Sequence, residues 1–235
     1  MGPSGGLEIA QPSGLASGSD GDTRRGDIAL RWCSTADELD AIGMPGVELV
    51  IWSRALPLCL VSWLEQLPAE HLPDFRILVS PVHFPVASKP LLGALYRADR
   101  KMPEMLAGDM ACLIDKFAEL AGTGLVDVRV ERITTDACWR FHRDCVDLRL
   151  LVTYRGPGTQ WIDSCHAEEA LALQERYDGP LRQAVLGSVS LFKGCCASDG
   201  EGVVHRSPPI HGTGKVRLLM CLNKPSRGSP PEWKP

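Results

Sequence analysis

The sequence has no apolar stretch long enough to cross a membrane and no Cys-x-x-Cys pair. A membrane-spanning helix needs about 20 mostly apolar residues in a row, and residues 56–63, one of the longest apolar stretches, are interrupted by Pro57 and Ser62. A structural zinc knuckle normally takes its cysteines from closely spaced pairs. The sequence therefore predicts neither a membrane protein nor a zinc knuckle.

Positive charge is not in excess either. The chain has 25 Lys and Arg residues against 29 Asp and Glu residues, which gives a net charge of −4. A protein that binds nucleic acid or an anionic membrane usually has a basic surface, so neither partner is expected. The first 26 residues also lack the apolar segment of a secretory leader. We therefore expect a cytoplasmic protein in which the nine cysteines are reduced thiols.

What the chain does have is enough length for one domain. Residues 1–26 are rich in Gly, Ser and Asp, a composition typical of a disordered tail. Residues 225–235 contain four prolines and are expected to form a loose C-terminal tail. The remaining residues, 27–224, are predicted to fold as a single domain.

Within that domain the sequence pattern changes near residue 125. Residues 27–124 alternate helix-like and strand-like segments, and Pro103–Leu120 has apolar residues at a helical period, with Gly122 after it. Residues 125–224 instead carry short apolar segments separated by Gly and Pro. The expected strands are 126–133, 148–154, 187–192, 202–205 and 216–222. Closely spaced short strands favour an α+β protein whose core is a jelly-roll, cupin-like barrel, with an N-terminal α/β cap and a packing helix.

Two histidines and one carboxylate in the second half form a candidate metal site. His142 and Asp144 are two residues apart, so on a strand they point to the same side. His205 follows 63 residues later in another strand-like segment. Two histidines and one carboxylate on one face of a metal form the facial triad of non-haem Fe(II) oxygenases. The sequence thus predicts His142, Asp144 and His205 as metal ligands.

Arg217 lies in the apolar segment 216–222. A buried guanidinium needs an anionic partner, and its planar fork suits a carboxylate. The distal carboxylate of 2-oxoglutarate fits this role if the keto-acid end of that molecule binds the iron.

The order of these residues resembles two families. His142-x-Asp144, His205 and Arg217 resemble the Fe(II)/2-oxoglutarate-dependent dioxygenases, which fold as a double-stranded β-helix. The resemblance implies that Thr153 or Tyr154 hydrogen-bonds the co-substrate. One departure is Leu219, since many of these oxygenases have Ser or Thr two residues after the arginine.

The second resemblance covers more of the chain. His142-x-Asp144, the segment RLLVTYRGPGTxW and the segment HRSPP resemble those of a mostly bacterial family known only as a domain of unknown function. It extends from about residue 30 to residue 224. This resemblance indicates kinship and implies no activity.

Arg149 and Trp161 are candidate substrate contacts. Arg149 shares its side of the predicted strand with Thr153, so it either binds an acidic group of a substrate or forms a surface salt bridge. Trp161 is either a substrate platform or a core residue.

The sequence therefore favours an Fe(II)/2-oxoglutarate-dependent oxidoreductase acting on a small, acidic molecule. The alternatives are a cupin-like barrel that binds or senses Zn²⁺ without oxygenase activity, and a barrel that serves only for interaction. Because the edge strands of such barrels often pair, a homodimer is compatible with the sequence. The sequence assigns no role to the adjacent pair Cys195 and Cys196.

Overall fold

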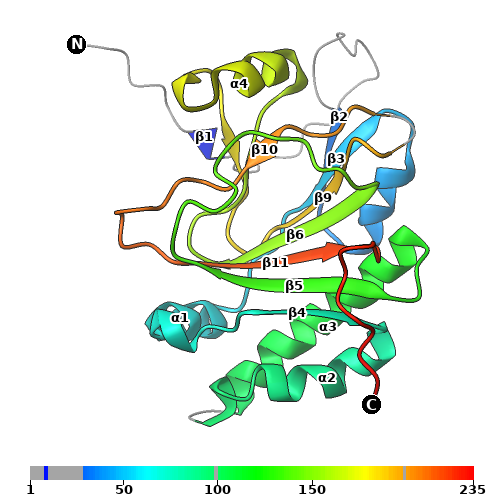
Figure 1. Cartoon of the computed structure of the whole chain (residues 1–235), viewed down its shortest axis with the longest axis vertical. Helices are drawn as coiled ribbons and strands as arrows, with labels where there is room; N and C mark the ends of the chain where they lie inside the picture. The colour runs from blue at the N-terminus through cyan, green and yellow to red at the C-terminus, as the bar shows by residue number, and fades with distance from the viewer. Residues whose placement is uncertain (1–7, 10–28, 98–99, 198–199) are drawn as a thin grey trace.

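The computed structural model describes residues 8–9, 29–97, 100–197 and 200–235, and its main feature is a sheet of seven strands (Figure 1). Its strand order is β2-β3-β9-β6-β11-β5-β4. β2 and β3 run parallel, and the other neighbours are antiparallel. The strands are β2 (Ala29–Cys33), β3 (Val47–Trp52), β4 (Phe75–Val79), β5 (Val126–Ile133), β6 (Leu148–Arg155), β9 (Val189–Lys193) and β11 (Arg217–Asn223).

A second, smaller sheet has four strands in the order β1-β8-β7-β10. Each strand has two residues: β1 (Glu8–Ile9), β7 (Gln160–Trp161), β8 (Arg182–Gln183) and β10 (His205–Arg206). This sheet packs over one face of the larger sheet, because Trp161 belongs to the same apolar cluster as Leu151 of β6 and Leu219 of β11.

The other face of the larger sheet is covered by three helices (Figure 1). These are α1 (Leu58–Gln66), α2 (Phe84–Leu91) and α3 (Lys101–Ala121). The helix α4 (Ala167–Leu173) lies on the opposite side and packs against Ile162 and Val204, next to the small sheet. Short 3-10 helices span Asp37–Gly43, Ala69–His71, Pro81–His83, Leu95–Arg97, Ser164–His166 and Gln174–Arg176. Among the described residues, no helix has both the length and the apolar character required to cross a membrane.

Strand β6 shows how alternation divides the core into two layers. Leu150, Val152 and Tyr154 are buried with the three helices, whereas Leu151 is buried with the small sheet. Successive side chains of a strand point to opposite faces, so Arg149, Leu151 and Thr153 of β6 point toward the small sheet. Burial on both faces explains why β6 has an almost continuous apolar sequence.

The predicted helix Pro103–Leu120 is confirmed as α3, which is longer by two residues at its start and one at its end. Gly122 ends it in the left-handed conformation with φ 59°, which glycine adopts without steric cost. Four of the predicted strands are confirmed as β5, β6, β9 and β11. The predicted strand 202–205 is wrong in extent, because only His205 of that range is in a strand and Gly202 has φ 84°.

The expected jelly-roll barrel is not confirmed, because none of the described strands forms a closed sheet, and the residues expected to form a cap contribute strands to the larger sheet. Strands β2, β3 and β4 come from residues 27–124, yet they extend the sheet formed by residues 125–224. The two halves therefore share one sheet, and the described strands form two sheets rather than one closed barrel. The fold is mixed α+β because helices pack on one face of a mostly antiparallel sheet. Strands from the first half extend this sheet beyond β9 and β5.

The C-terminal segment 225–235, expected to be loose, is attached to the domain. The backbone N–H of Trp233 donates to Leu78 O at 2.7 Å, and Ser229 Oγ donates to Asp127 Oδ2 at 2.6 Å. Trp233 also packs against the helix-side core. Of the expected N-terminal tail, only Glu8–Ile9 is described, and the remainder lies outside the described residues.

Candidate metal centre

His142 and His205 are distant in sequence but adjacent in the structure. The backbone N–H of each donates to the carbonyl of the other at 3.0 Å, and together they form an isolated antiparallel bridge. Their ring centroids are 4.6 Å apart. His205 is also paired with Trp161 of β7, so backbone hydrogen bonds at the edge of the small sheet fix the positions of both rings.

Backbone carbonyls determine which nitrogen of each ring faces the site. His142 Nδ1 lies 2.8 Å from Arg140 O, and His205 Nδ1 lies 3.0 Å from Val203 O. A carbonyl can only accept a hydrogen bond, so we infer that the proton of each neutral ring is on Nδ1. The Nε2 lone pairs are then available, as they are in histidines that bind metals.

Asp144 lies where both Nε2 atoms point. Its Oδ1 is 3.5 Å from His142 Nε2, and its Oδ2 is 3.3 Å from His205 Nε2. One ligand atom from each of the three residues lies within 4.8 Å of the others. The structure thus brings His142, Asp144 and His205 together.

A cation suits this group of atoms. Asp144 Oδ2 is buried and has no hydrogen-bond partner, and a buried polar atom without a partner is costly. Two Nε2 lone pairs beside it cannot donate to it. A divalent ion would satisfy all three groups at once, and two histidines with one carboxylate are suitable donors for Fe²⁺ or Zn²⁺.

Asp144 and His142 influence each other's ionisation. Burial alone would raise the pKa of Asp144, but protonated histidine rings, unlike neutral ones, can donate to it, and the hydrogen bonds of His142 and His205 with the charge of Arg149 outweigh burial and hold that pKa well below its usual range. The hydrogen bond to Asp144 raises the pKa of His142 above 6.5, although burial opposes the rise. A proton and a metal ion therefore compete for His142.

Arg149 contacts the site from β6. It lies on the same side of the strand as Thr153, as the sequence predicts. Its Nη1 donates to Asp144 Oδ1 and its Nε donates to Asn223 Oδ1 at 2.8 Å. The side chain is 24% exposed and lines the pocket. In this structure the guanidinium orients a carboxylate of the protein.

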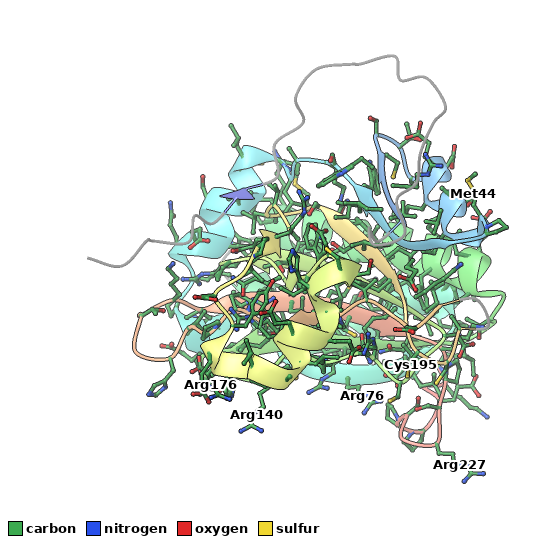
Figure 2. All side chains as sticks on the ribbon, turned by 90° about the horizontal axis from the view of Figure 1, so that it is seen from above. Met44, Arg76, Arg140, Arg176, Cys195 and Arg227 are labelled. Atoms are coloured by element: carbon green, nitrogen blue, oxygen red, sulfur yellow. The ribbon has the colours of Figure 1, made fainter. Side chains whose placement is uncertain are left out.

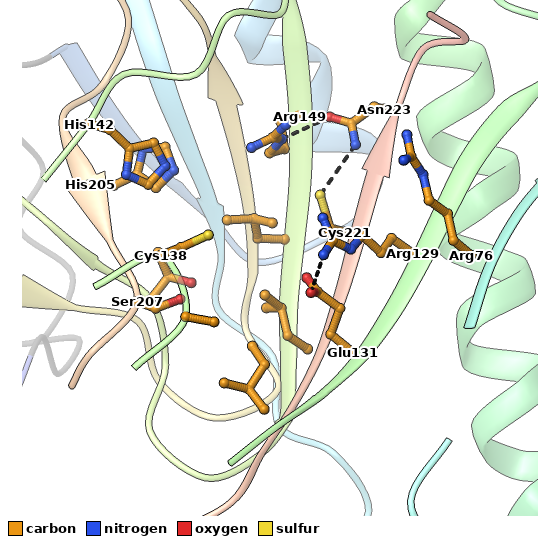
Figure 3. A pocket seen from close by; sticks show the side chains of 15 residues that line it. Arg76, Arg129, Glu131, Cys138, His142, Arg149, His205, Ser207, Cys221 and Asn223 are labelled. Carbon is orange, nitrogen blue, oxygen red and sulfur yellow. Dashed lines mark hydrogen bonds and ion pairs between the residues drawn. The ribbon is translucent and has the colours of Figure 1, made fainter. Parts of the chain in front are cut away.

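The site opens into a pocket of about 140 Å³ between the two sheets (Figure 3). In this view the two imidazole rings lie together on one side, and Arg149 and Asn223 lie on another. Among the residues that line it are Thr159 and Ser207. Both hydroxyls accept hydrogen bonds from Arg217, so that arginine adjoins the pocket.

Arg217 is completely buried and has no carboxylate partner among the described residues. It donates to Pro157 O at 2.7 Å, to Ser207 Oγ at 2.7 Å and to Thr159 Oγ1 at 3.4 Å. All three acceptors are neutral, and burial lowers the pKa of Arg217 to about 10. The guanidinium remains charged at neutral pH, and an anion in the pocket would compensate this charge.

A glycine turn provides two of these acceptors. Gly156 has φ 79°, and a Cβ at this position would lie 2.3 Å from Val216 O. Only glycine fits so close to the neighbouring strand. The turn at Gly156–Thr159 thus delivers Pro157 O and Thr159 Oγ1 to Arg217.

The structure does not bring every predicted residue to the pocket. Tyr154 is fully buried on the helix side of the sheet, where its hydroxyl donates to Asp109 Oδ2 at 2.7 Å. It therefore cannot reach a co-substrate on the other face. Thr153 is buried on the pocket side. Trp161 is completely buried in the core between the sheets and is not a substrate platform.

Sequence reasoning missed several residues of the pocket. Ser207 and Thr159 hold Arg217, and Asn223 holds Arg149. Ser207 was visible in the HRSPP segment and Thr159 in the glycine turn, but neither spacing shows which side chain they contact. Cys138, which lines the pocket with φ 54°, had no signal in the sequence.

Comparisons with known proteins identify kinship. A family model described as "Protein of unknown function (DUF1826)" matches residues 34–223, which confirms the resemblance to a family of unknown function. No curated protein matches the chain.

Several solved structures are similar to this one. A prolyl-4-hydroxylase from Pseudomonas putida is 15% identical, with 83% of this chain and 94% of that chain covered, at a TM-score of 0.40. A full-length protein of Neurospora crassa, solved in complex with alpha-KG, is 13% identical, with 86% of each chain covered, at a TM-score of 0.43. A bsmA homolog from Methylobium petroleophilum is 15% identical, with 86% of this chain and 96% of that chain covered, at a TM-score of 0.42.

Proposed function

We propose that this chain, which belongs to the DUF1826 family of proteins of unknown function, is an oxidoreductase that uses Fe(II) and 2-oxoglutarate. One observation carries the proposal. One pocket adjoins both the cluster of His142, Asp144 and His205 and the buried guanidinium of Arg217, which has no carboxylate partner among the described residues. A site for a cation and a site for an anion in one small cavity suit a co-substrate that bridges them.

His142, Asp144 and His205 would hold the iron. When bound, Fe(II) supplies activation of O₂ for the oxidation of a substrate, with 2-oxoglutarate as the source of the additional electrons. Arg149 keeps the Asp144 carboxylate oriented. The carbonyls of Arg140 and Val203 keep both Nε2 atoms turned toward it.

Arg217 would bind the distal carboxylate of 2-oxoglutarate. Its donors are held by Pro157, Ser207 and Thr159, so little reorganisation is needed when the anion enters. The hydroxyls of Thr159 and Ser207 are within the pocket wall and can turn to donate to the same carboxylate. Thr153 is on the correct face of β6 to assist, whereas Tyr154 is not.

The substrate would be a small, acidic molecule. Arg76 and Arg129 also line the pocket, and their side chains are 41% and 51% exposed. Each is paired with one carboxylate, Asp127 or Glu131, and its exposed side can still meet an anionic group. Under this proposal the two facing sheets are the layers of a double-stranded β-helix that is not closed by continuous pairing.

The experiment is anaerobic addition of Fe(II) and then 2-oxoglutarate to the full chain. We expect a weak visible charge-transfer band in the wild type and a much weaker one in Arg217→Ala. Because Arg217 also supports the Gly156 turn, Ser207→Ala serves as a milder variant that removes one of its acceptors. It should raise the 2-oxoglutarate concentration needed for half-maximal absorbance.

Arg155→Ala is the matched control, since Arg155 donates to Leu64 O and Leu67 O on the helix side. It should leave the band unchanged. Release of succinate with consumption of O₂ would support the activity. Bound zinc in the purified protein with no band on addition of Fe(II) and 2-oxoglutarate would overturn the proposal in favour of a zinc-binding module.

A further inference from the structure

We propose that Cys145 and Cys195 are a thiol modification site, at which the two form a reversible disulfide by exchange with a low-molecular-weight disulfide. Their Sγ atoms are 3.8 Å apart, although 50 residues separate them in the sequence. Both cysteines are exposed and unoxidised in the structure (Cys195 is labelled in Figure 2). The pair lies outside the pocket, so this role is additional to the proposed oxygenase activity and does not depend on it.

The backbone already holds the two segments together. The N–H of Cys195 donates to Asp144 O at 2.9 Å, the N–H of Cys196 donates to Val146 O at 3.2 Å, and the N–H of Gly194 donates to Asp147 O at 3.1 Å. Three bonds along four residues keep the segments in register. The fold therefore holds the backbones that carry the two cysteines close together.

Close packing at Gly194 strengthens this contact. A Cβ at that position would lie 2.2 Å from Val146 O and 2.6 Å from Asp144 O. Glycine is therefore required for the end of β9 to approach the 144–147 segment so closely. A disulfide needs its sulfurs about 2.05 Å apart, so the two exposed side chains must turn toward each other to close the remaining gap.

The chemistry balances with one small disulfide, such as oxidised glutathione, as the oxidant. The thiolate of one cysteine attacks a sulfur of the small disulfide and releases one thiolate, which takes up a proton. The thiolate of the other cysteine then attacks the mixed disulfide and releases the second. Two protein thiols are oxidised, one small disulfide is reduced to two thiols, and a reducing thiol reverses both steps.

A disulfide between Cys145 and Cys195 would restrict the motion of the backbone next to Asp144. Cys145 follows Asp144 directly, and Cys195 binds the backbone carbonyl of Asp144. A covalent link between them would fix the segment that carries this carboxylate to the end of β9. We expect amide hydrogen exchange in residues 144–149 to become several-fold slower in the oxidised protein.

The test uses the reduced full chain, incubated with oxidised glutathione at mildly alkaline pH and then analysed by mass spectrometry without reductant. The intact protein should lose the mass of two hydrogens. Trypsin cleaves after Arg143, Arg149, Lys193 and Arg206, so the bond should join peptide 144–149 to peptide 194–206. Dithiothreitol should separate the two peptides.

Serine variants identify the partners, because peptide 194–206 contains both Cys195 and Cys196. Cys196→Ser is the matched control for an exposed neighbouring thiol and should keep the linked peptides. Cys145→Ser and Cys195→Ser should lose them. A linked pair that survives Cys195→Ser, a bond confined to peptide 194–206, or no internal bond in the wild type would each overturn the proposal, whether or not the protein binds iron.

Discussion

The guanidinium of Arg149 donates directly to Asp144, the carboxylate that lies between His142 and His205. Arg149 is on β6 and Asp144 is on the segment before it, so the ion pair joins the sheet to the site. The Asp144 side chain is only 5% exposed. Without Arg149, only a protonated histidine or a metal ion could compensate the negative charge of this carboxylate.

Replacement of Arg149 should therefore destabilise the metal-free protein more than the metal-bound protein. We expect Arg149→Met to lower the free energy of unfolding by about 1–3 kcal/mol in EDTA, since removal of Arg149 leaves a buried carboxylate without one of its hydrogen-bond donors. A bound divalent ion compensates that charge, so saturating Mn²⁺ should recover most of the loss. Urea unfolding with and without the metal measures both values.

Arg143→Met is the control for this experiment. Its partners Glu168 and Glu201 are 80% and 88% exposed, and exposed pairs contribute at most about 1 kcal/mol. Its effect should be small and independent of metal. An equal loss for Arg149→Met in EDTA and in Mn²⁺ would contradict the role assigned to Arg149.

The three ligands can be tested without oxygen chemistry. Anaerobic titration with Co²⁺, followed by its visible absorption, should show one binding site per chain in the wild type. His142→Ala, His205→Ala and Asp144→Ala should each weaken binding by more than about 100-fold, because loss of outer-shell partners alone costs about 10–100-fold. His211→Ala changes an exposed histidine and should bind Co²⁺ normally. If a variant of His142, His205 or Asp144 bound Co²⁺ with wild-type affinity, the replaced residue would not be a metal ligand.

Stability in the absence of metal should depend on pH through His142. The folded state raises the pKa of His142 above 6.5, so the folded protein binds this proton more tightly than the unfolded chain does. The resulting stabilisation is complete below pH 6.5 and is lost as the pH rises through the raised pKa. In EDTA the wild type should therefore be more stable to unfolding than His142→Gln below pH 6.5, and this difference should shrink as the pH rises through the raised pKa of His142.

The carboxylate acts in the opposite direction at lower pH. The pKa of Asp144 is below its ordinary value of 3.8, so its stabilisation is present above pH 3.8 and is lost as the pH falls toward the lowered pKa. Acid unfolding monitored by tryptophan fluorescence should thus begin at higher pH in Asp144→Asn. A wild-type advantage over His142→Gln that grows from neutral to alkaline pH would contradict the pairing of His142 with Asp144.

Tyr154→Phe tests which face of β6 belongs to the pocket. The Tyr154 hydroxyl donates to Asp109, which also accepts two hydrogen bonds from Arg54. Loss of a hydrogen bond to a charged group costs about 1.5–3 kcal/mol. We expect a loss of this size in the free energy of unfolding, with Co²⁺ affinity unchanged. A large loss of metal or 2-oxoglutarate binding would contradict the placement of Tyr154 among the helices.

The longest helix and the central strands were predictable because their side chains repeat at a fixed period. α3 has apolar residues at a helical period and a glycine after its last turn. β6 and β11 are apolar on both faces, which predicts buried strands but does not show which face meets which layer. Tyr154 and Thr153 illustrate this, since the sequence offers both as co-substrate contacts and only the packing separates them.

The extent of the sheet was not predictable. β3 and β4 resemble any short apolar strand, and their partners β9 and β5 are respectively about 140 and 50 residues away in the chain. No local pattern encodes a pairing across such a distance. For the same reason, residues 27–124 resembled a separate cap although three of their strands extend the larger sheet.

The sequence by itself determined the kinds of group available to this site: two imidazoles, one carboxylate and one arginine in an apolar strand, in a fixed order. These residue types can be recognised in the sequence because metal ions and anions bind to only a few kinds of side chain. Only the tertiary structure decided that His142 meets His205 through a backbone bridge, that Arg149 serves Asp144, and that Cys145 lies beside Cys195. These contacts depend on strand register and close glycine packing, which arise from the whole fold and leave no signal in any short segment.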